Sequence, residues 1–249
     1  MSTGATVADL AAEQDALHDC VAELAPDDWL RPTPARGWDV RDTISHLADT
    51  DEMAIDTVRD GPRALNAVAE LAATADDVTY QGVLRGRRKP GAACMAWWEG
   101  AFREERDVLA ALDPATRVPW GIGMRATSFV SARLMETWAH GLDVRAALGL
   151  ETVDTDRLAH VAWLATRALP YAYTVAGRTP PDGALRVELS LPSGATWEYG
   201  PPDAPHRITG PAGEYCRVFV RRLSPASARG LRADGEVARA AIEVARAYL

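Results

Sequence analysis

The sequence lacks the cysteine patterns that indicate a disulfide framework or a structural zinc site. Its three cysteines, Cys20, Cys94 and Cys216, are far apart and form no Cys-x-x-Cys pair. An odd, sparse count is typical of proteins in a reducing compartment. The first 19 residues also lack a basic segment followed by an apolar run, which is the pattern of a secretory signal. We therefore expect free thiols and a cytoplasmic protein.

Long apolar runs and net positive charge are absent as well. No run reaches the length of a membrane-spanning helix, and the formal net charge of -8 disfavours binding to nucleic acid or to anionic membranes. Lysine occurs once, as Lys89, in the basic cluster LRGRRKP at 84–90. A solvated loop is the simpler interpretation of this cluster, and a site for a small anionic substrate or cofactor is the alternative.

The spacing of apolar residues predicts helices over the first 150 positions. The composition, 47% hydrophobic and 25% charged, is that of a globular protein. Apolar residues at helical spacing, bounded by Pro, Gly and capping residues, predict four long helices at 7–24, 39–61, 90–114 and 124–149 and a short one at 62–75. Asp39 and Asp42 resemble an N-terminal cap, and Gly149 a C-terminal one. Four long helices joined by loops predict a helix bundle.

After Gly149 the pattern changes to mixed helices and short strands. Helical segments are expected at 154–173, 213–223 and 234–249, and strand-like pieces at 184–191, 195–200 and 206–210. The prediction is a mainly α chain with a four-helix bundle at 1–150 and a small α+β domain at 151–249.

The segment 133–149, RLMETWAHGLDVRAALG, carries ionisable residues on a helix that is otherwise apolar. Arg133, Glu136, His140 and Asp143 fall within one stripe, and burying such groups without partners is costly. Glu and His at positions i and i+4 can direct an oxygen and a nitrogen at one metal ion. The alternative is a salt-bridge ladder in which Arg133 pairs with Glu136 and His140 with Asp143. Spacing alone slightly favours the ladder.

A third ligand from another helix would favour the metal. His46 is the best candidate, because it lies in the middle of the predicted helix 39–61. It does not share the main apolar stripe of that helix, however, so periodicity alone predicts a histidine at the boundary of the core.

Two segments together resemble a known family. GWDVRDTISHLADTDE and RLMETWAHGLDVRAALG are similar to the mycothiol-dependent maleylpyruvate isomerase family of the DinB-like metal-binding superfamily, and 218–249 is similar to the end of its smaller C-terminal domain. The chain most resembles an actinobacterial branch distinct from the isomerase proper. The resemblance implies a DinB-like four-helix bundle with a divalent metal on His46, Glu136 and His140. Zinc is the expected ion, with Fe²⁺ or Ni²⁺ as alternatives.

The resemblance also implies a chemistry. Three protein ligands leave coordination positions open, and a thiol bound there is deprotonated. The thiol in the family is mycothiol, expected here as co-substrate. Its thiolate adds to an activated double bond and leaves again, giving isomerisation, or displaces a leaving group or opens an epoxide, giving an S-conjugate. The expected partners are a small electrophile and this thiol, and the chain is expected to be a monomer or homodimer.

Further residues are assigned around this predicted centre. Asp143 either orients the His140 imidazole or is a solvated or capping residue, and Arg133 either binds an anionic substrate or pairs with Glu136. Trp120 and Arg125, in the segment before the metal helix, either line a pocket for cofactor or substrate or anchor an ordinary loop.

Three other functions stay open at this point. Two His and one carboxylate also match the facial triad of non-haem iron enzymes. A thiol-independent isomerase or cyclase would use the metal as a Lewis acid. A non-catalytic protein that binds a small molecule is the third.

Overall fold

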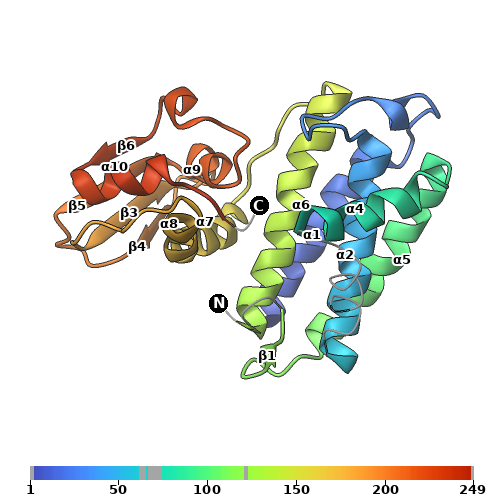
Figure 1. Cartoon of the computed structure of the whole chain (residues 1–249), viewed down its shortest axis with the longest axis horizontal. Coiled ribbons are helices and arrows are strands. Elements are labelled where there is room, and N and C mark those ends of the chain that lie inside the picture. The colour runs from blue at the N-terminus through green and yellow to red at the C-terminus, as the bar shows by residue number, and fades with distance from the viewer. Residues whose placement is uncertain (1–2, 62–65, 67–74, 121–122, 248–249) are drawn as a thin grey trace. The chain divides into compact units, whose positions relative to one another are not determined.

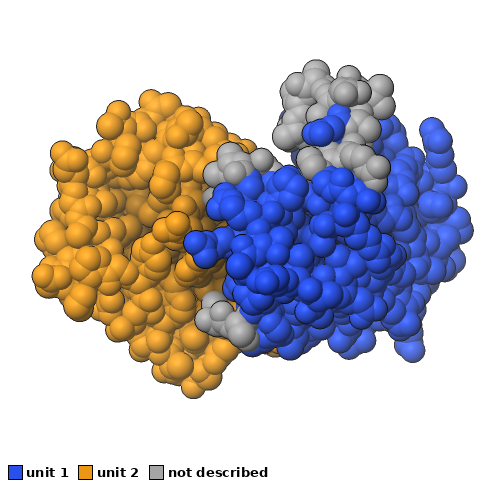
Figure 2. All heavy atoms as spheres, turned by 90° about the horizontal axis from the view of Figure 1, so that it is seen from below, with its two compact units in different colours: residues 1–152 blue, residues 153–249 orange. Residues whose placement is uncertain are grey.

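The computed structural model describes residues 3–61, 66, 75–120 and 123–247. The chain divides into two compact units, Met1–Thr152 and Val153–Leu249, here called the N-terminal and C-terminal units and coloured separately in Figure 2. The described residues are mainly helical with a small sheet, which confirms the predicted fold class. Within these residues, every helix is too short or too polar to cross a membrane.

The N-terminal unit is built around four long helices, as predicted. They are α1 (Thr3–Val21), α2 (Val40–Asp60), α5 (Gly91–Ala110) and α6 (Ala126–Leu148). Helix α2 packs against α5, and α1 packs against α6 and α5 (Figure 1). Apolar side chains fill the space between them, including the fully buried Ile44, Leu47 and Trp98.

The helix ends follow the local sequence signals. Asp39 and Asp42 form a capping box at the start of α2, in which the Asp42 amide donates to Asp39 Oδ1 at 2.7 Å and the Asp39 amide donates to Asp42 Oδ2 at 3.3 Å. Gly149 ends α6 in the left-handed conformation, with φ 69°. Both predicted caps are confirmed.

An additional helix, α4 (Ala75–Gly86), was not expected from the sequence. The short helix predicted at 62–75 lies almost wholly outside the described residues. The basic cluster at 84–90 is not a loop throughout, because its first three residues form the end of α4. Helix α4 packs closely on α2, since a Cβ added at Gly86 would lie only 1.8 Å from Ser45 Oγ.

The connection between α1 and α2 folds into a tight structure with a short 3-10 helix, η1 (Asp28–Leu30). The carbonyl of Trp38 accepts hydrogen bonds from the Thr33 amide (2.9 Å) and the Thr33 hydroxyl (3.1 Å), and Pro32 bridges to Asp39. These bonds fix Trp38 immediately before α2.

A two-stranded hairpin, β1 (Arg117–Val118) and β2 (Met124–Arg125), precedes α6. It lies at the end of the bundle opposite the connection between α1 and α2 (Figure 1).

The C-terminal unit combines a four-stranded sheet with short helices. The strands are β3 (Leu185–Ser190), β4 (Thr196–Tyr199), β5 (His206–Pro211) and β6 (Arg232–Asp234), in the order β4-β3-β5-β6 with only β3 and β5 parallel. The helices are α7 (Leu158–Arg167), α8 (Leu169–Val175), α9 (Ala212–Phe219), η2 (Pro225–Ser227) and α10 (Glu236–Glu243). The helix predicted at 154–173 is thus two helices, and β6 was not predicted.

Candidate metal centre

The side chains of His46, Glu136 and His140 converge between α2 and α6. One ligand atom from each lies within 4.8 Å of the other two. Glu136 Oε2 is 3.6 Å from His46 Nε2 and 3.5 Å from His140 Nε2, and the two imidazole centroids are 4.7 Å apart. The structure therefore brings together the three residues that the family resemblance implied as ligands.

These separations fit a shared cation better than direct hydrogen bonds. A tetrahedral ion with bonds of about 2.0–2.2 Å holds its ligand atoms about 3.3–3.6 Å apart. The two distances from Glu136 Oε2 fall at this spacing, whereas an N–H···O hydrogen bond is about 2.9 Å long. Two imidazoles and one carboxylate are also a common donor set for divalent transition metals. The residues present therefore fit a metal ion.

The protonation states of the ligands favour metal binding. Burial lowers the pKa of His46 to about 4, so its imidazole is neutral at neutral pH and keeps a lone pair for a cation. Burial opposes ionisation of Glu136, but the imidazoles of His140 and His46 hold the pKa of this carboxyl well below its usual value. The site thus offers the neutral imidazole of His46 and the carboxylate of Glu136 to a cation.

Asp143 lies behind His140 on the side away from Glu136. Its Oδ2 is 3.4 Å from His140 Nδ1, and its side chain is 1% exposed. A carboxylate at this nitrogen favours the tautomer that carries the proton on Nδ1 and leaves Nε2 free to bind a metal. This half of the alternative ladder, His140 with Asp143, is compatible with the metal centre.

The other half of the ladder is not formed. Arg133 is buried and pairs with carboxylates from two other helices, its Nη2 lying 2.5 Å from Asp51 Oδ1 and its Nε 2.9 Å from Glu105 Oε1. The predicted Arg133–Glu136 pair is not formed. Asp51 on α2 and Glu105 on α5 bind the Arg133 guanidinium instead. Glu136 is thereby left to the two histidines.

The Arg133 cluster links all four long helices. Gln14 Nε2 donates to Glu105 Oε2 (2.9 Å), and Trp98 Nε1 donates to Asp51 Oδ2 (3.1 Å). Burial and the neighbouring Asp51 raise the pKa of Glu105 to about 8, and burial also raises the pKa of Asp51. Two buried carboxylates facing one guanidinium are neutral as a group when they share one proton.

Trp38 is the aromatic residue at the candidate metal centre. Its ring centroid is 5.1 Å from that of His46 and 5.9 Å from that of His140, and it stacks on His140 with an interplanar angle of 18°. Arg87 holds the adjacent chain, donating to the Gly37 carbonyl (2.9 Å) and to both oxygens of the buried Asp42. Trp38 also borders a pocket of about 290 Å³ that includes Asp39, Arg41 and Arg87 among its lining residues.

Trp120 and Arg125 are not brought to the three candidate ligands. Both belong to the hairpin segment at the other end of the bundle, and Arg125 precedes Glu136 by 11 residues, or about 16 Å of helix. Trp120 packs against Phe129, with centroids 5.4 Å apart, and Arg125 is exposed. Sequence reasoning missed Trp38, although its place just before a capping box and eight residues before His46 was a usable signal.

A helical bundle whose helices supply two imidazoles and a carboxylate to one point defines a candidate mononuclear metal protein. The model of the mycothiol maleylpyruvate isomerase N-terminal domain matches residues 10–145. The chain belongs to the mycothiol maleylpyruvate isomerase family.

The chain is also similar to two curated proteins and to two solved structures. Two uncharacterised proteins of Mycobacterium tuberculosis, from strains CDC 1551 / Oshkosh and H37Rv, are each 39% identical to the chain over 249 residues, covering 98% of it and 95% of their own length. The crystal structure of a mycothiol-dependent maleylpyruvate isomerase has a TM-score of 0.60 at 13% identity, covering 94% of this chain and 93% of that one. A histidine-to-alanine variant of that isomerase gives 0.58 at the same identity and coverage. These structures share the fold.

Proposed function

We propose that the chain is a metal-dependent enzyme that uses a low-molecular-weight thiol of the mycothiol type to isomerise or S-conjugate a small electrophile. The observation that carries this proposal is the convergence of His46, Glu136 and His140 at the spacing of metal ligands. Membership of the family supports the thiol. Zinc is the proposed ion, with Fe²⁺ or Ni²⁺ as alternatives.

A metal ion held by His46, Glu136 and His140 would lower the pKa of a thiol bound to it and so supply a thiolate at neutral pH. The chain's own residues prepare that site. His46 stays neutral because it is buried, and Glu136 supplies the negative charge. The Asp143 carboxylate, 3.4 Å from His140 Nδ1, favours the tautomer that leaves Nε2 free to face the centre.

Two further residues shape the proposed site without binding the metal. Trp38 covers the two imidazoles on one side and keeps water from that face. Arg133 is a positioning residue, because its two carboxylate partners occupy the guanidinium and hold α6 in register with α2 and α5.

The test compares metal content in wild type and in the His46→Ala, Glu136→Gln and His140→Ala variants, with His18→Ala as a control in the same unit. His18 packs edge-on against Phe102 and is not one of the three converging side chains. We expect one ion per chain in wild type and control and loss of the ion in all three variants, with folding checked by circular dichroism. Full metal content in the folded variants would contradict the proposal.

Turnover is tested on the same proteins with a panel of electrophiles, in the presence and absence of mycothiol. Consumption or isomerisation that requires both thiol and metal supports the proposal. The donor set also favours a second candidate, a non-haem iron enzyme. Stoichiometric iron with oxygen consumption and no need for thiol would select that function instead.

A further inference from the structure

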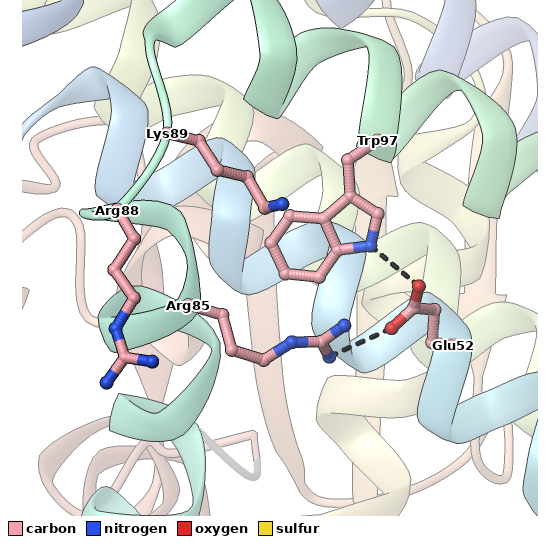
Figure 3. A pocket seen from close by; sticks show the side chains of 5 residues that line it. All are labelled: Glu52, Arg85, Arg88, Lys89 and Trp97. Atoms are coloured by element: carbon pink, nitrogen blue, oxygen red, sulfur yellow. Dashed lines mark hydrogen bonds and ion pairs between the residues drawn. The ribbon is translucent and has the colours of Figure 1, made fainter.

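A second pocket opens on the outer side of the N-terminal unit, where α4, α5 and α2 meet. It has a volume of about 350 Å³ and is lined by Glu52, Arg85, Arg88, Lys89 and Trp97 (Figure 3). Glu52 follows His46 by six residues on α2, which places it about 9 Å along the helix and about 120° around it. The pocket is therefore separate from the candidate metal centre.

One wall of this pocket is held by a chain of hydrogen bonds. Trp97 Nε1 donates to Glu52 Oε1 (2.7 Å), and Arg85 Nη1 lies 2.9 Å from Glu52 Oε2 (Figure 3). Arg85 also pairs with the largely buried Asp49, and its guanidinium carbon lies 4.4 Å from the centroid of the Trp97 ring. The indole and the Arg85 guanidinium are thus fixed before any ligand arrives.

The opposite side of the pocket carries cations without a countercharge. Lys89 Nζ lies 5.8 Å from the Trp97 ring centroid, and Arg88 lines the pocket beside it. Within the part of the chain that the structure describes, no carboxylate lies within ion-pair distance of either side chain. Arg85 faces the two carboxylates of Asp49 and Glu52, whereas Arg88 and Lys89 add two cations, so the five groups together carry one net positive charge.

We propose that this pocket binds a small oxyanion, in the form of a carboxylate or phosphate group on a small molecule. Arg and Lys supply the donors that such oxyanions prefer, and Arg88 and Lys89 make the pocket net positive. The rigid indole edge supplies a surface for the organic part of the ligand. A polymeric nucleic acid does not fit, because the pocket is small and the chain carries a net charge of -8.

The single lysine of the chain allows a direct test. Reductive methylation with ¹³C-formaldehyde labels Lys89 and the N-terminal amine and keeps both charges. The full-length protein is titrated with inorganic phosphate or with maleate at constant ionic strength, and the Lys89 methyl signal is followed by NMR. We expect a saturable shift of that signal with at least one of the two anions. The lower saturating concentration identifies phosphate or carboxylate as the better group.

Matched variants separate the pocket from general charge effects. Arg88→Ala should weaken binding about tenfold, because it removes one of the two cations that make the pocket net positive. Arg103→Ala should leave it unchanged, since Arg103 is exposed on α5 and pairs with Glu99 outside the pocket. A Lys89 shift that sodium chloride reproduces, or that is equally strong in Arg88→Ala, would overturn the proposal.

Discussion

The charge state of the buried cluster formed by Asp51, Glu105 and Arg133 predicts an unusual dependence of stability on pH. The pKa of Glu105 is raised to about 8 in the folded protein, against about 4.5 when unfolded. Between these values the folded state keeps a proton that the unfolded chain has released. The free energy of unfolding that this group contributes therefore falls as the pH rises from about 5 towards 8.

The Glu105→Gln variant isolates this contribution, because glutamine is neutral at every pH. One proton is worth about 1.4 kcal/mol per pH unit, which gives an upper limit of roughly 3 kcal/mol between pH 5 and pH 7.5. Because Asp51 and Arg133 share the charge with Glu105, we expect about half of that limit. Any hydrogen bond that the amide loses to Gln14 or Arg133 costs the same at each pH and cancels in the comparison.

The assay is urea unfolding of both proteins at several pH values, in the presence of chelator. Tryptophan fluorescence reports mainly on the N-terminal unit, since six of the eight tryptophans belong to it. The wild type should lose stability relative to Glu105→Gln by about 1.5 kcal/mol over this range. Glu104→Gln is the control, because that neighbouring carboxylate is half-exposed and pairs with Arg59. A constant difference between wild type and Glu105→Gln at every pH would show that Glu105 is ionised in the fold and would refute the shared proton.

Three further predictions concern the proposed metal centre. Asp143→Asn should weaken metal affinity about 10- to 100-fold, measured in competition with a chelator. Unchanged affinity would mean that Asp143 contributes only to packing. Trp38→Phe should remove much of the fluorescence quenching that Cu²⁺ or Co²⁺ causes, because its ring lies against two ligands, whereas Trp120→Phe should not. Metal at about 1,000 times its Kd should raise the free energy of unfolding by about 4 kcal/mol, so its removal by a chelator should lower the Tm by roughly 10 °C. An equal Tm with and without chelator would contradict metal binding by the folded protein.

Local sequence signals were sufficient for the helices of the bundle. The period of the apolar residues, the Asp39–Asp42 cap and the terminal Gly149 each act within a few residues of chain, so they predict α2 and α6 without tertiary information. Helix α4 escaped prediction because its stability comes from packing on α2, where Gly86 allows a close approach that no periodicity reveals. The strand β6 was missed because three residues carry too little pattern and are defined by pairing with β5.

The sequence by itself also placed Glu136 and His140 on one face of one helix, because their spacing is a local property of α6. Only the tertiary structure decided that His46 faces them, since α2 is buried on more sides than its apolar stripe indicates, and His46 is 3% exposed instead of lying at the boundary. The partners of Arg133 and the position of Trp38 were decided in the same way. Contacts between helices depend on which polar faces meet, and a polar residue buried against a partner has the same helical spacing as one that faces water.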